Sequence, residues 1–358
     1  MPQDDLLSLF LSLAPEKTLE IGRMAQVLCE VARLQPVGRR TLAARLSMTE
    51  REIRDASDSL RQQGLVTSDG SGMRLTPRAQ GLLASANEVS GRLFALSSLE
   101  DFLRRALGCR YVTVIRGSAD KDPRVLAEVG RRAAQALKKE LRDGEILAVS
   151  GGSTMAAVAE GLAGNGSRPV MVVPLRGGMG PVMEGQASVI AAEIAEKLGG
   201  EYRMIHLPDT LDAEALREML KMDDVRETVS LIRRADVVMH GIGRADDMAE
   251  KRHLSPDILS LLRERGAVGE AFGVFFDRAG RAVYRLETWS GEHAEAAEGR
   301  VLAAACGSRK AEAIIACLRY EKHCALITDE GAARRMLSLI EAEGPLPTTV
   351  SAAPGPGK

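Results

Sequence analysis

The pattern of apolar and polar positions is helical over the first part of the chain. Residues 20–34 repeat apolar side chains every three or four positions, and residues 39–46 do the same over a shorter length. A third helix is predicted over 49–63, because Thr49 and Glu52 form the pattern of a capping box at its start. Two helices separated by so short a turn are typical of a helix-turn-helix.

The period changes to two directly after the third helix. The segments 65–67 and 73–75 alternate apolar and polar positions, and the dipeptide Asp69-Gly70 between them favours a hairpin turn. Helix, helix and hairpin wing, in this order, predict a winged helix-turn-helix DNA-binding domain over residues 1–80. The third helix would be its recognition helix.

Residues 79–107 continue as a leucine-rich helical pattern. A helix of this kind either connects two domains or pairs two protomers, so residues 81–108 are expected to be a helical linker. At the other end of the chain, residues 344–358 are rich in proline and glycine and are expected to be a disordered tail.

From residue 110 onward, short apolar runs alternate with amphipathic helical stretches. This alternation predicts a mostly parallel sheet with helices on both faces, so residues 109–343 are expected to form a larger, doubly wound α/β domain. In such sheets ligands bind at the carboxyl ends of the strands. The expected strands are 111–115, 146–150, 170–175, 202–208, 235–243, 300–306 and 324–329, and the expected helices include 123–142, 185–199, 212–234 and 308–320.

Composition narrows the class of protein. The chain has 358 residues, of which 45% are hydrophobic and 27% are charged, which suits two folded domains and excludes a disordered chain. No apolar run approaches the ~20 residues that cross a bilayer, and the N-terminus lacks the basic start of a secretory signal. The five cysteines are scattered without a CxxC pair, which argues against disulfides or a zinc site. We therefore expect a cytoplasmic protein with neither metal nor cofactor.

Charge is distributed unevenly along the chain, although the formal net charge is −1. Between Arg33 and Arg78 there are nine arginines, no lysine and five acidic residues, a bias that suggests contact with phosphate groups. A solvated helical surface, on which Arg51 and Arg54 merely pair with neighbouring acids, would have the same composition. The winged architecture favours DNA, and the expected contacts are Arg39, Arg40, Thr49, Glu50, Arg51, Arg54 and Arg74.

Four of the expected strands end in glycine followed by hydroxyl or cationic side chains. Two glycines and two hydroxyls at 151–154 would expose backbone N–H groups at a helix start, an arrangement that binds anions, although the chain has no P-loop motif. Tight turns of this kind also occur without ligands, but their repetition favours a ligand with one or two phosphates. The candidates are Gly151, Gly152, Ser153, Thr154, Arg176, Lys251, Arg252, Ser308 and Lys310.

A sugar that carries two phosphates would use all four strand ends. One phosphate would lie on the glycine-rich turn with Ser308 and Lys310, and the other on Arg176 and the cationic pair that follows the fifth strand. Gln186 and Glu270 could bind sugar hydroxyls, but by themselves both are better explained as ordinary exposed polar residues.

Six stretches of the sequence, in order across both domains, carry a resemblance to a known family. They are PVGRRTLAARLSMTEREIRDASDSLRQQGLV, SGGSTMAAVAEGL, VPLRGGMG, HGIGRADDMAEKR, GEAFGVFFDRAG and CGSRKAEAI. The chain resembles the sugar-binding transcriptional regulators of the SorC/DeoR class, and within it the group that regulates central glycolytic genes. The resemblance implies a tetrameric repressor that fructose 1,6-bisphosphate releases from operator DNA. It also implies an effector domain similar in fold to phosphosugar isomerases and glucosamine-6-phosphate deaminase.

The resemblance also implies an effector site. The sequence departs from the family pattern at two turns of this site. It adds Gln186 and Glu270 to the strand-end candidates as ligand-binding residues. The first turn reads GGST where the family pattern resembles GGTT, which keeps the hydroxyl. Cys306 and Arg309 stand where a glycine and a serine are usual, and they add a side chain and a charge close to the expected phosphate. The implied set is Gly152, Ser153, Thr154, Arg176, Gln186, Lys251, Arg252, Glu270 and Lys310.

The main alternatives are a phosphosugar isomerase or deaminase, and a regulator that responds to a monophosphate. The deaminases have a histidine soon after the strand that matches 235–243, whereas this chain has none before His253. Catalytic residues are therefore not expected, and a purely structural second domain would leave the strand-end cations unexplained. His206 and His240 are expected to be core residues, and Trp289 is assigned no role.

Overall fold

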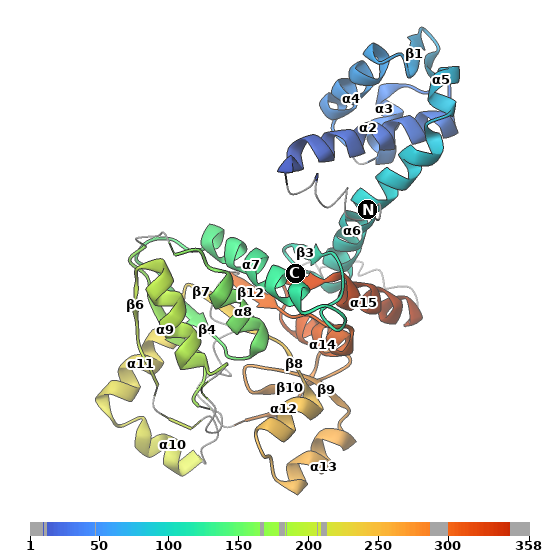
Figure 1. The fold of residues 1–358 in the computed structure, drawn as a ribbon. Coiled ribbons are helices and arrows are strands. Elements are labelled where there is room, and N and C mark those ends of the chain that lie inside the picture. The colour runs from blue at the N-terminus through green and yellow to red at the C-terminus, as the bar shows by residue number, and fades with distance from the viewer. Residues whose placement is uncertain are drawn as a thin grey trace, which may run out of the picture. The chain divides into compact units, whose positions relative to one another are not determined.

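The computed structural model divides into two compact units, Met1–Ser98 and Leu99–Lys358 (Figure 1). It describes residues 10, 13–46, 48–164, 168–178, 183, 185–205, 207–208, 213–286 and 300–343. The predicted tail at 344–358, His206 and Trp289 therefore lie outside the described residues.

The first unit begins with three helices and a two-stranded hairpin, in the order that the sequence pattern predicts. Val27, Leu42, Ile53 and Leu60 bury their side chains together in its core. The elements are α2 (Pro15–Leu34), α3 (Arg39–Leu46), α4 (Glu50–Gln62), β1 (Val66–Asp69), β2 (Gly72–Leu75), α5 (Pro77–Gln80) and α6 (Leu83–Leu107).

The hairpin is fixed to the helices by backbone pairing. β1 and β2 are antiparallel, with Asp69 opposite Gly72, and Val37 exchanges two backbone hydrogen bonds with Met73 on the other side of β2. A Cβ atom on Gly72 would lie 2.8 Å from the backbone nitrogen of Val37, so only glycine allows this approach. The wing is thus part of the same core as the helices.

The leucine-rich stretch 79–107 is not one continuous helix. α5 ends at Gln80, two residues intervene, and α6 begins at Leu83. The boundary between the two units falls within α6, after Ser98.

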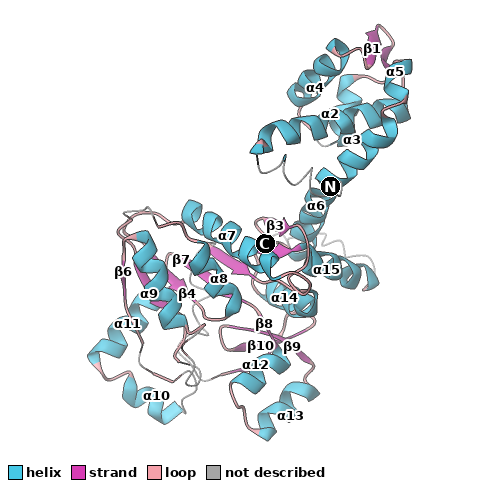
Figure 2. Ribbon diagram, viewed as in Figure 1, coloured by secondary structure: helices cyan, strands magenta, loops and turns pink. Residues whose placement is uncertain are grey.

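A seven-stranded parallel sheet forms the centre of the second unit, which confirms the predicted fold class (Figure 2). Its order is β3-β13-β12-β7-β4-β5-β6, and every neighbouring pair is parallel. The chain leaves β4 toward β5 and β6, and then crosses to β7 on the other side of β4. The strands are β3 (Val112–Ile115), β4 (Ile146–Val149), β5 (Met171–Pro174), β6 (Glu201–Tyr202), β7 (Val237–Gly241), β12 (Val301–Ala304) and β13 (Ala325–Asp329).

Helices cover both faces of this sheet, as the doubly wound pattern requires. α7, α8 and α9 bury a continuous apolar core against one face, and α11 and α15 pack against the other (Figure 1). The predicted helix 212–234 is interrupted at residues 220–222. The helices are α7 (Pro123–Glu140), α8 (Ser153–Gly161), α9 (Ala187–Leu198), α10 (Ala213–Met219), α11 (Asp223–Arg233), α14 (Ala311–Tyr320) and α15 (Glu330–Ala342).

A second, antiparallel sheet that the sequence pattern did not predict inserts between β7 and β12. Its order is β11-β10-β9-β8, and β9 packs on α14 so closely that a Cβ atom on Gly269 would lie 2.8 Å from the Cα of Ala313. The inserted elements are β8 (Gly243–Arg244), α12 (Ala245–Lys251), α13 (Pro256–Glu264), β9 (Ala267–Ala271), β10 (Val274–Asp277) and β11 (Ala282–Arg285).

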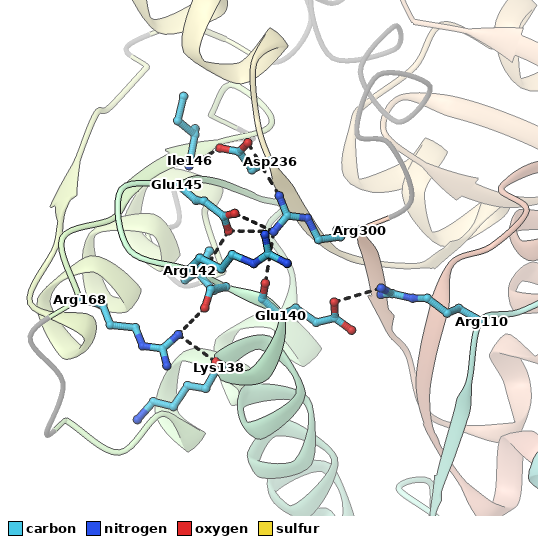
Figure 3. A network of polar contacts seen from close by, with 10 residues as sticks. Arg110, Lys138, Glu140, Arg142, Glu145, Ile146, Arg168, Asp236 and Arg300 are labelled. Atoms are coloured by element: carbon cyan, nitrogen blue, oxygen red, sulfur yellow. Dashed lines mark hydrogen bonds and ion pairs between the residues drawn. The ribbon is translucent and has the colours of Figure 1, made fainter.

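An ion-pair network joins the amino ends of three central strands (Figure 3). Arg300, which precedes β12, donates to both oxygens of Glu145, which precedes β4, at 2.8 and 2.9 Å. Asp236, which precedes β7, accepts from the backbone of Ile146 at 2.9 Å and lies 3.8 Å from Arg300. The network therefore ties these strands together at their amino ends, and their carboxyl ends lie at the opposite end of the sheet.

Candidate functional site

A pocket lies at the carboxyl ends of β4, β5, β7 and β12, which are neighbours in the sheet. It encloses about 650 Å³ when the space open to solvent at its mouth is counted. Because the chain reverses direction between β4 and β7, this is the switch point at which open α/β sheets bind ligands. The lining residues are Ser150, Gly151, Gly152, Ser153, Thr154, Met155, Arg176, Gly241, Ile242, Gly243, Met248, Lys251, Glu270, Ala271, Phe272 and Lys310.

The turn from β4 into α8 aims a helix start at the pocket. Gly152 is the N-cap of α8 with φ of 110°, and no side chain caps the helix. A Cβ atom on Gly151 would lie 2.4 Å from the carbonyl oxygen of Gly185, so the turn cannot carry a larger residue there. The Ser150 hydroxyl accepts from the backbone N–H of Gly241 at 2.9 Å and joins the ends of β4 and β7. Exposed N–H groups at a helix start attract anions.

A buried carboxylate lies between two arginines at the floor of the pocket. The Oε1 atom of Glu270 accepts from Arg176 at 2.9 Å, from Arg252 at 3.3 Å and from the backbone of Gly273 at 2.6 Å. Glu270 is only 2% exposed, so it is not an exposed polar residue. Burial lowers the pKa of Arg176, and the charge of Glu270 opposes that shift. Two cations on one anion leave this cluster with excess positive charge.

Two lysines add to the positive charge. Burial lowers the pKa of Lys310 below its ordinary value, and the charge of Lys251 lowers it further, while Cys306, Asp247 and Asp120 raise it. A desolvated ammonium beside a second ammonium is stabilised by any anion that enters. The lysines and the α8 helix start together make a site for a phosphate or a similar oxyanion.

The turn after β12 already holds a carboxylate of the protein. Asp120 accepts from the backbone N–H of Ser308 at 2.6 Å and from its hydroxyl at 2.7 Å. These bonds, which outweigh the effect of burial, lower the pKa of Asp120. The Ser308 donors are therefore occupied by Asp120, and Lys310 is the residue of this turn that lines the pocket.

Eight of the eleven predicted effector residues line the pocket in the structure, and three do not. Gln186 is the N-cap of α9 and lines a separate hollow beside Gly178, although its backbone lies against Gly151. Arg252 is completely buried behind Glu270, and Ser308 is bound by Asp120. The eight are Gly151, Gly152, Ser153, Thr154, Arg176, Lys251, Glu270 and Lys310.

The two departures from the family pattern take different positions. Cys306 is 8% exposed, and burial raises the pKa of its thiol. Arg309 is exposed. Neither side chain lines the pocket itself.

Sequence reasoning missed several residues of the site. Ser150 and Gly241 stand at strand ends, so the rule that found the other candidates could have found them. Asp120 follows β3 in the chain. Phe272, with φ of 56°, and Met248 come from the inserted sheet and its helix, and no local signal marks them as pocket residues.

The candidate DNA-contacting residues lie along α3, α4 and the wing. Thr49 caps α4 through the predicted capping box with Glu52, so its hydroxyl is engaged in the cap. Arg40 lies 3.6 Å from Glu50, and Arg51 lies 4.0 Å from Asp55, with both arginines more than nine-tenths exposed.

The remaining arginines of this unit differ in how firmly they are held. Arg39 pairs with Asp58 at 3.5 Å. Arg54 and Arg74 are exposed. Among the described residues, Arg54 takes part in none of the ion pairs that α4 makes. Exposed pairs of this kind contribute little to stability and leave the guanidinium groups available to phosphates.

Two family models match successive parts of the chain. The "CggR N-terminal DNA binding domain" matches residues 22–89, and the "Putative sugar-binding domain" matches residues 91–338. No helix among the described residues has the length and apolarity to cross a membrane.

Similar proteins are known by sequence and by structure. The central glycolytic genes regulator of Priestia megaterium is 38% identical over 91% of this chain and 96% of that protein. The regulator of the same name from Bacillus subtilis is 34% identical, with the same coverage. A SorC family transcriptional regulator from Enterococcus faecalis, solved by crystallography, is 36% identical with a TM-score of 0.62, over 67% of this chain and 99% of that one.

Proposed function

Because this chain belongs to the SorC family of sugar-binding transcriptional regulators, we propose that it represses glycolytic genes and that fructose 1,6-bisphosphate releases it from operator DNA. The general function follows from the two domains and the similar proteins: the chain is a sugar-responsive transcriptional regulator and not an enzyme. The observation that supports the effector class is the pocket at the switch point, where Lys251, Lys310, Arg176 and the α8 helix start converge.

The chemistry of the pocket suits an anionic sugar rather than a reaction. The α8 helix start and Lys310 would hold one phosphate, and Lys251 and Arg176 a second. Glu270 accepts hydrogen bonds from two arginines and a backbone N–H, so its carboxylate is already engaged within the protein.

We propose that the DNA-binding form is a dimer or tetramer in the cytoplasm. The arginines of α3, α4 and the wing would bind operator phosphates, and paired winged helices would recognise two half-sites. The effector would bind more tightly to a conformation that no longer matches the spacing of these half-sites.

One observation favours a regulator that responds to a monophosphate instead. Asp120 occupies the two donors of Ser308, so the turn after β12 offers only Lys310 to a phosphate. With fewer donors on that side, the pocket would favour a ligand with a single phosphate on the α8 helix start.

Thermal unfolding of the full chain with a panel of sugar phosphates tests the effector class. A ligand at 100 times its Kd adds about 2.7 kcal/mol to the stability of the folded state. We expect a selective shift with fructose 1,6-bisphosphate, and smaller shifts with fructose 6-phosphate and inorganic phosphate. A shift of equal size with the monophosphate would select the alternative effector, and no shift with any sugar phosphate would contradict the site.

Binding to labelled DNA from upstream of the host's glycolytic genes tests the repressor. We expect binding that exceeds binding to a scrambled duplex of equal length, and release by the sugar phosphate that shifted the unfolding temperature. Tighter binding in its presence would contradict the proposed direction of the response.

A further inference from the structure

Beneath the effector pocket, three buried side chains with a nitrogen, a sulfur and an oxygen ligand atom lie close together. One ligand atom from each of His240, Cys317 and Glu321 lies within 4.8 Å of the other two, and all three residues are buried. His240 belongs to β7, Cys317 lies in the last turn of α14, and Glu321 is the C-cap residue of that helix. Cys317 and Glu321 are four positions apart, which places them on one face of the helix end.

The hydrogen bonds around His240 leave one ring nitrogen aimed at the carboxylate. Its Nδ1 atom lies 3.0 Å from the carbonyl oxygen of Gly241, which can only accept, so Nδ1 carries a proton. In the neutral ring Nε2 then has a lone pair, and it lies 2.9 Å from Oε2 of Glu321. Two acceptors at this distance repel each other unless a proton or a cation lies between them.

No aligned hydrogen bond fills this gap. Among the described residues, Nε2 of His240 and both carboxylate oxygens of Glu321 are buried without a hydrogen-bond partner. The side chain of Glu321 is only 6% exposed, and a buried carboxylate without a donor is costly. A cation bound by nitrogen, sulfur and oxygen satisfies all of these atoms together.

We propose that His240, Cys317 and Glu321 bind a structural zinc ion. Imidazole, thiolate and carboxylate are the ligands of Zn²⁺ in proteins, and a metal-binding histidine typically donates its other N–H to a backbone carbonyl. That is the bond between His240 and Gly241.

The three ligands come from two distant segments of the chain, β7 and the end of α14, which is why no metal motif is visible in the sequence. Structural zinc sites have four ligands, and this cluster supplies three of them.

The site adjoins the effector pocket. The ring of His240 lies 4.2 Å from that of Phe272, which lines the pocket, and Gly241 lines it directly. Zinc would therefore stabilise the floor of the effector site. The zinc site does not depend on the identity of the effector, so either proposal can fail alone.

Metal content of the full chain, purified without chelators or a metal-affinity tag, tests the proposal. We expect about one zinc per chain after gel filtration, and the apoprotein should regain it from added Zn²⁺ with a higher unfolding temperature. Co²⁺ in place of zinc should give the absorption bands of thiolate coordination, a readout that needs no variant. Less than one tenth of an equivalent after reconstitution, or Co²⁺ without thiolate bands, would overturn the site.

Two ligand variants test whether the zinc ion binds at this cluster. Cys317→Ser and Glu321→Gln should weaken zinc binding by about 100-fold or more, since loss of even a supporting residue costs 10- to 100-fold. Cys29→Ser, in the DNA-binding unit, is the matched control and should keep the zinc. Zinc retained by both ligand variants would show that the ion binds elsewhere. If neither variant folds, the Co²⁺ spectrum of the unaltered chain decides.

Discussion

Lys310 shows how one half-buried charge prepares a pocket for an anion. The residue follows a turn that Asp120 holds from the other side, and its half-buried ammonium is poorly solvated. The unliganded protein bears a desolvation cost that a bound phosphate would relieve. The charge of this side chain therefore strengthens ligand binding and lowers the stability of the unliganded protein.

Lys310→Met keeps the length of the side chain and removes its charge. We expect the sugar phosphate to bind about tenfold more weakly or worse, which is about 1.4 kcal/mol, while the unliganded protein becomes more stable at neutral pH. Since the folded pKa of Lys310 is lowered, the unfolded chain binds more protons, and wild-type stability should rise with pH through the window below the ordinary pKa of 10.5. The variant should lack this rise. Thermal unfolding between pH 7 and 10, with and without ligand, measures both effects, and unchanged ligand binding would place the phosphate elsewhere.

Asp120→Asn removes the negative charge of Asp120 and keeps its hydrogen bond with Ser308. The amide oxygen can still accept from Ser308, but the negative charge that faces Lys310 is removed. We expect the anionic effector to bind about 3- to 10-fold more tightly, which corresponds to about 1 kcal/mol. Isothermal titration calorimetry measures the change, with Asp122→Asn on the same loop as the control. Weaker binding by Asp120→Asn would mean that Asp120 supports the ligand rather than opposing it.

At the scale of elements, helix α4 combines a stable start with exposed arginines. The capping box between Thr49 and Glu52 satisfies the first N–H groups, and Ile53, Ala56 and Leu60 face the core. The arginines on the opposite face contribute little to folding, so they can be replaced without loss of the domain.

Arg54→Ala should weaken DNA binding and leave the effector-dependent unfolding shift unchanged. If Arg54 contacts one phosphate, the slope of log K against log salt should fall by about 1. Fluorescence anisotropy at several salt concentrations measures the slope. Arg61→Ala, whose side chain pairs with Asp58 at 3.1 Å in the last turn, is the control. An unchanged slope for Arg54→Ala would remove this residue from the interface.

The network at the amino ends of β4, β7 and β12 predicts a dependence of stability on pH. Burial raises the pKa of Glu145, but the hydrogen bonds from Arg300 and from the backbone of Arg142 outweigh it and lower the pKa below 4.5. The stabilisation is therefore complete above the ordinary pKa and is lost as pH falls through the lowered one. Glu145→Gln should cost about 2 kcal/mol at pH 7, and the difference from wild type should shrink toward pH 3. A difference in urea unfolding that stays constant with pH would contradict this role.

At the scale of the whole molecule, the candidate DNA-contacting residues and the pocket belong to different units of one chain, and α6 contains the boundary between them. A response to sugar therefore requires a coupling free energy between the units. Such couplings are typically about 1–3 kcal/mol and act equally in both directions.

We therefore expect operator DNA to weaken effector binding by the same factor by which the effector weakens DNA binding. Effector titrations by calorimetry, with and without a saturating duplex, measure one factor, and anisotropy measures the other. In Lys310→Met both factors should approach one at the same effector concentration. Unequal factors in the wild type would show that the two ligands do not act through one equilibrium.

The sequence by itself determined those features that depend on neighbours along the chain. The capping box at Thr49, the Asp69-Gly70 hairpin and the alternation of strand and helix are local signals, so the winged helix and the parallel sheet could be predicted. Glycines at strand ends likewise marked the turn at 151–154, because parallel strands carry their ends to one edge.

Only the tertiary structure decided the contacts between distant segments. Glu270 is buried between Arg176 and Arg252, Ser308 is bound by Asp120 from 188 positions away, and His240 on the central strand meets Glu321 at the end of α14. None of these side chains carries a local pattern that names its partner. Their partners follow from the order of the strands and from the inserted antiparallel sheet, which packing of the whole domain selects.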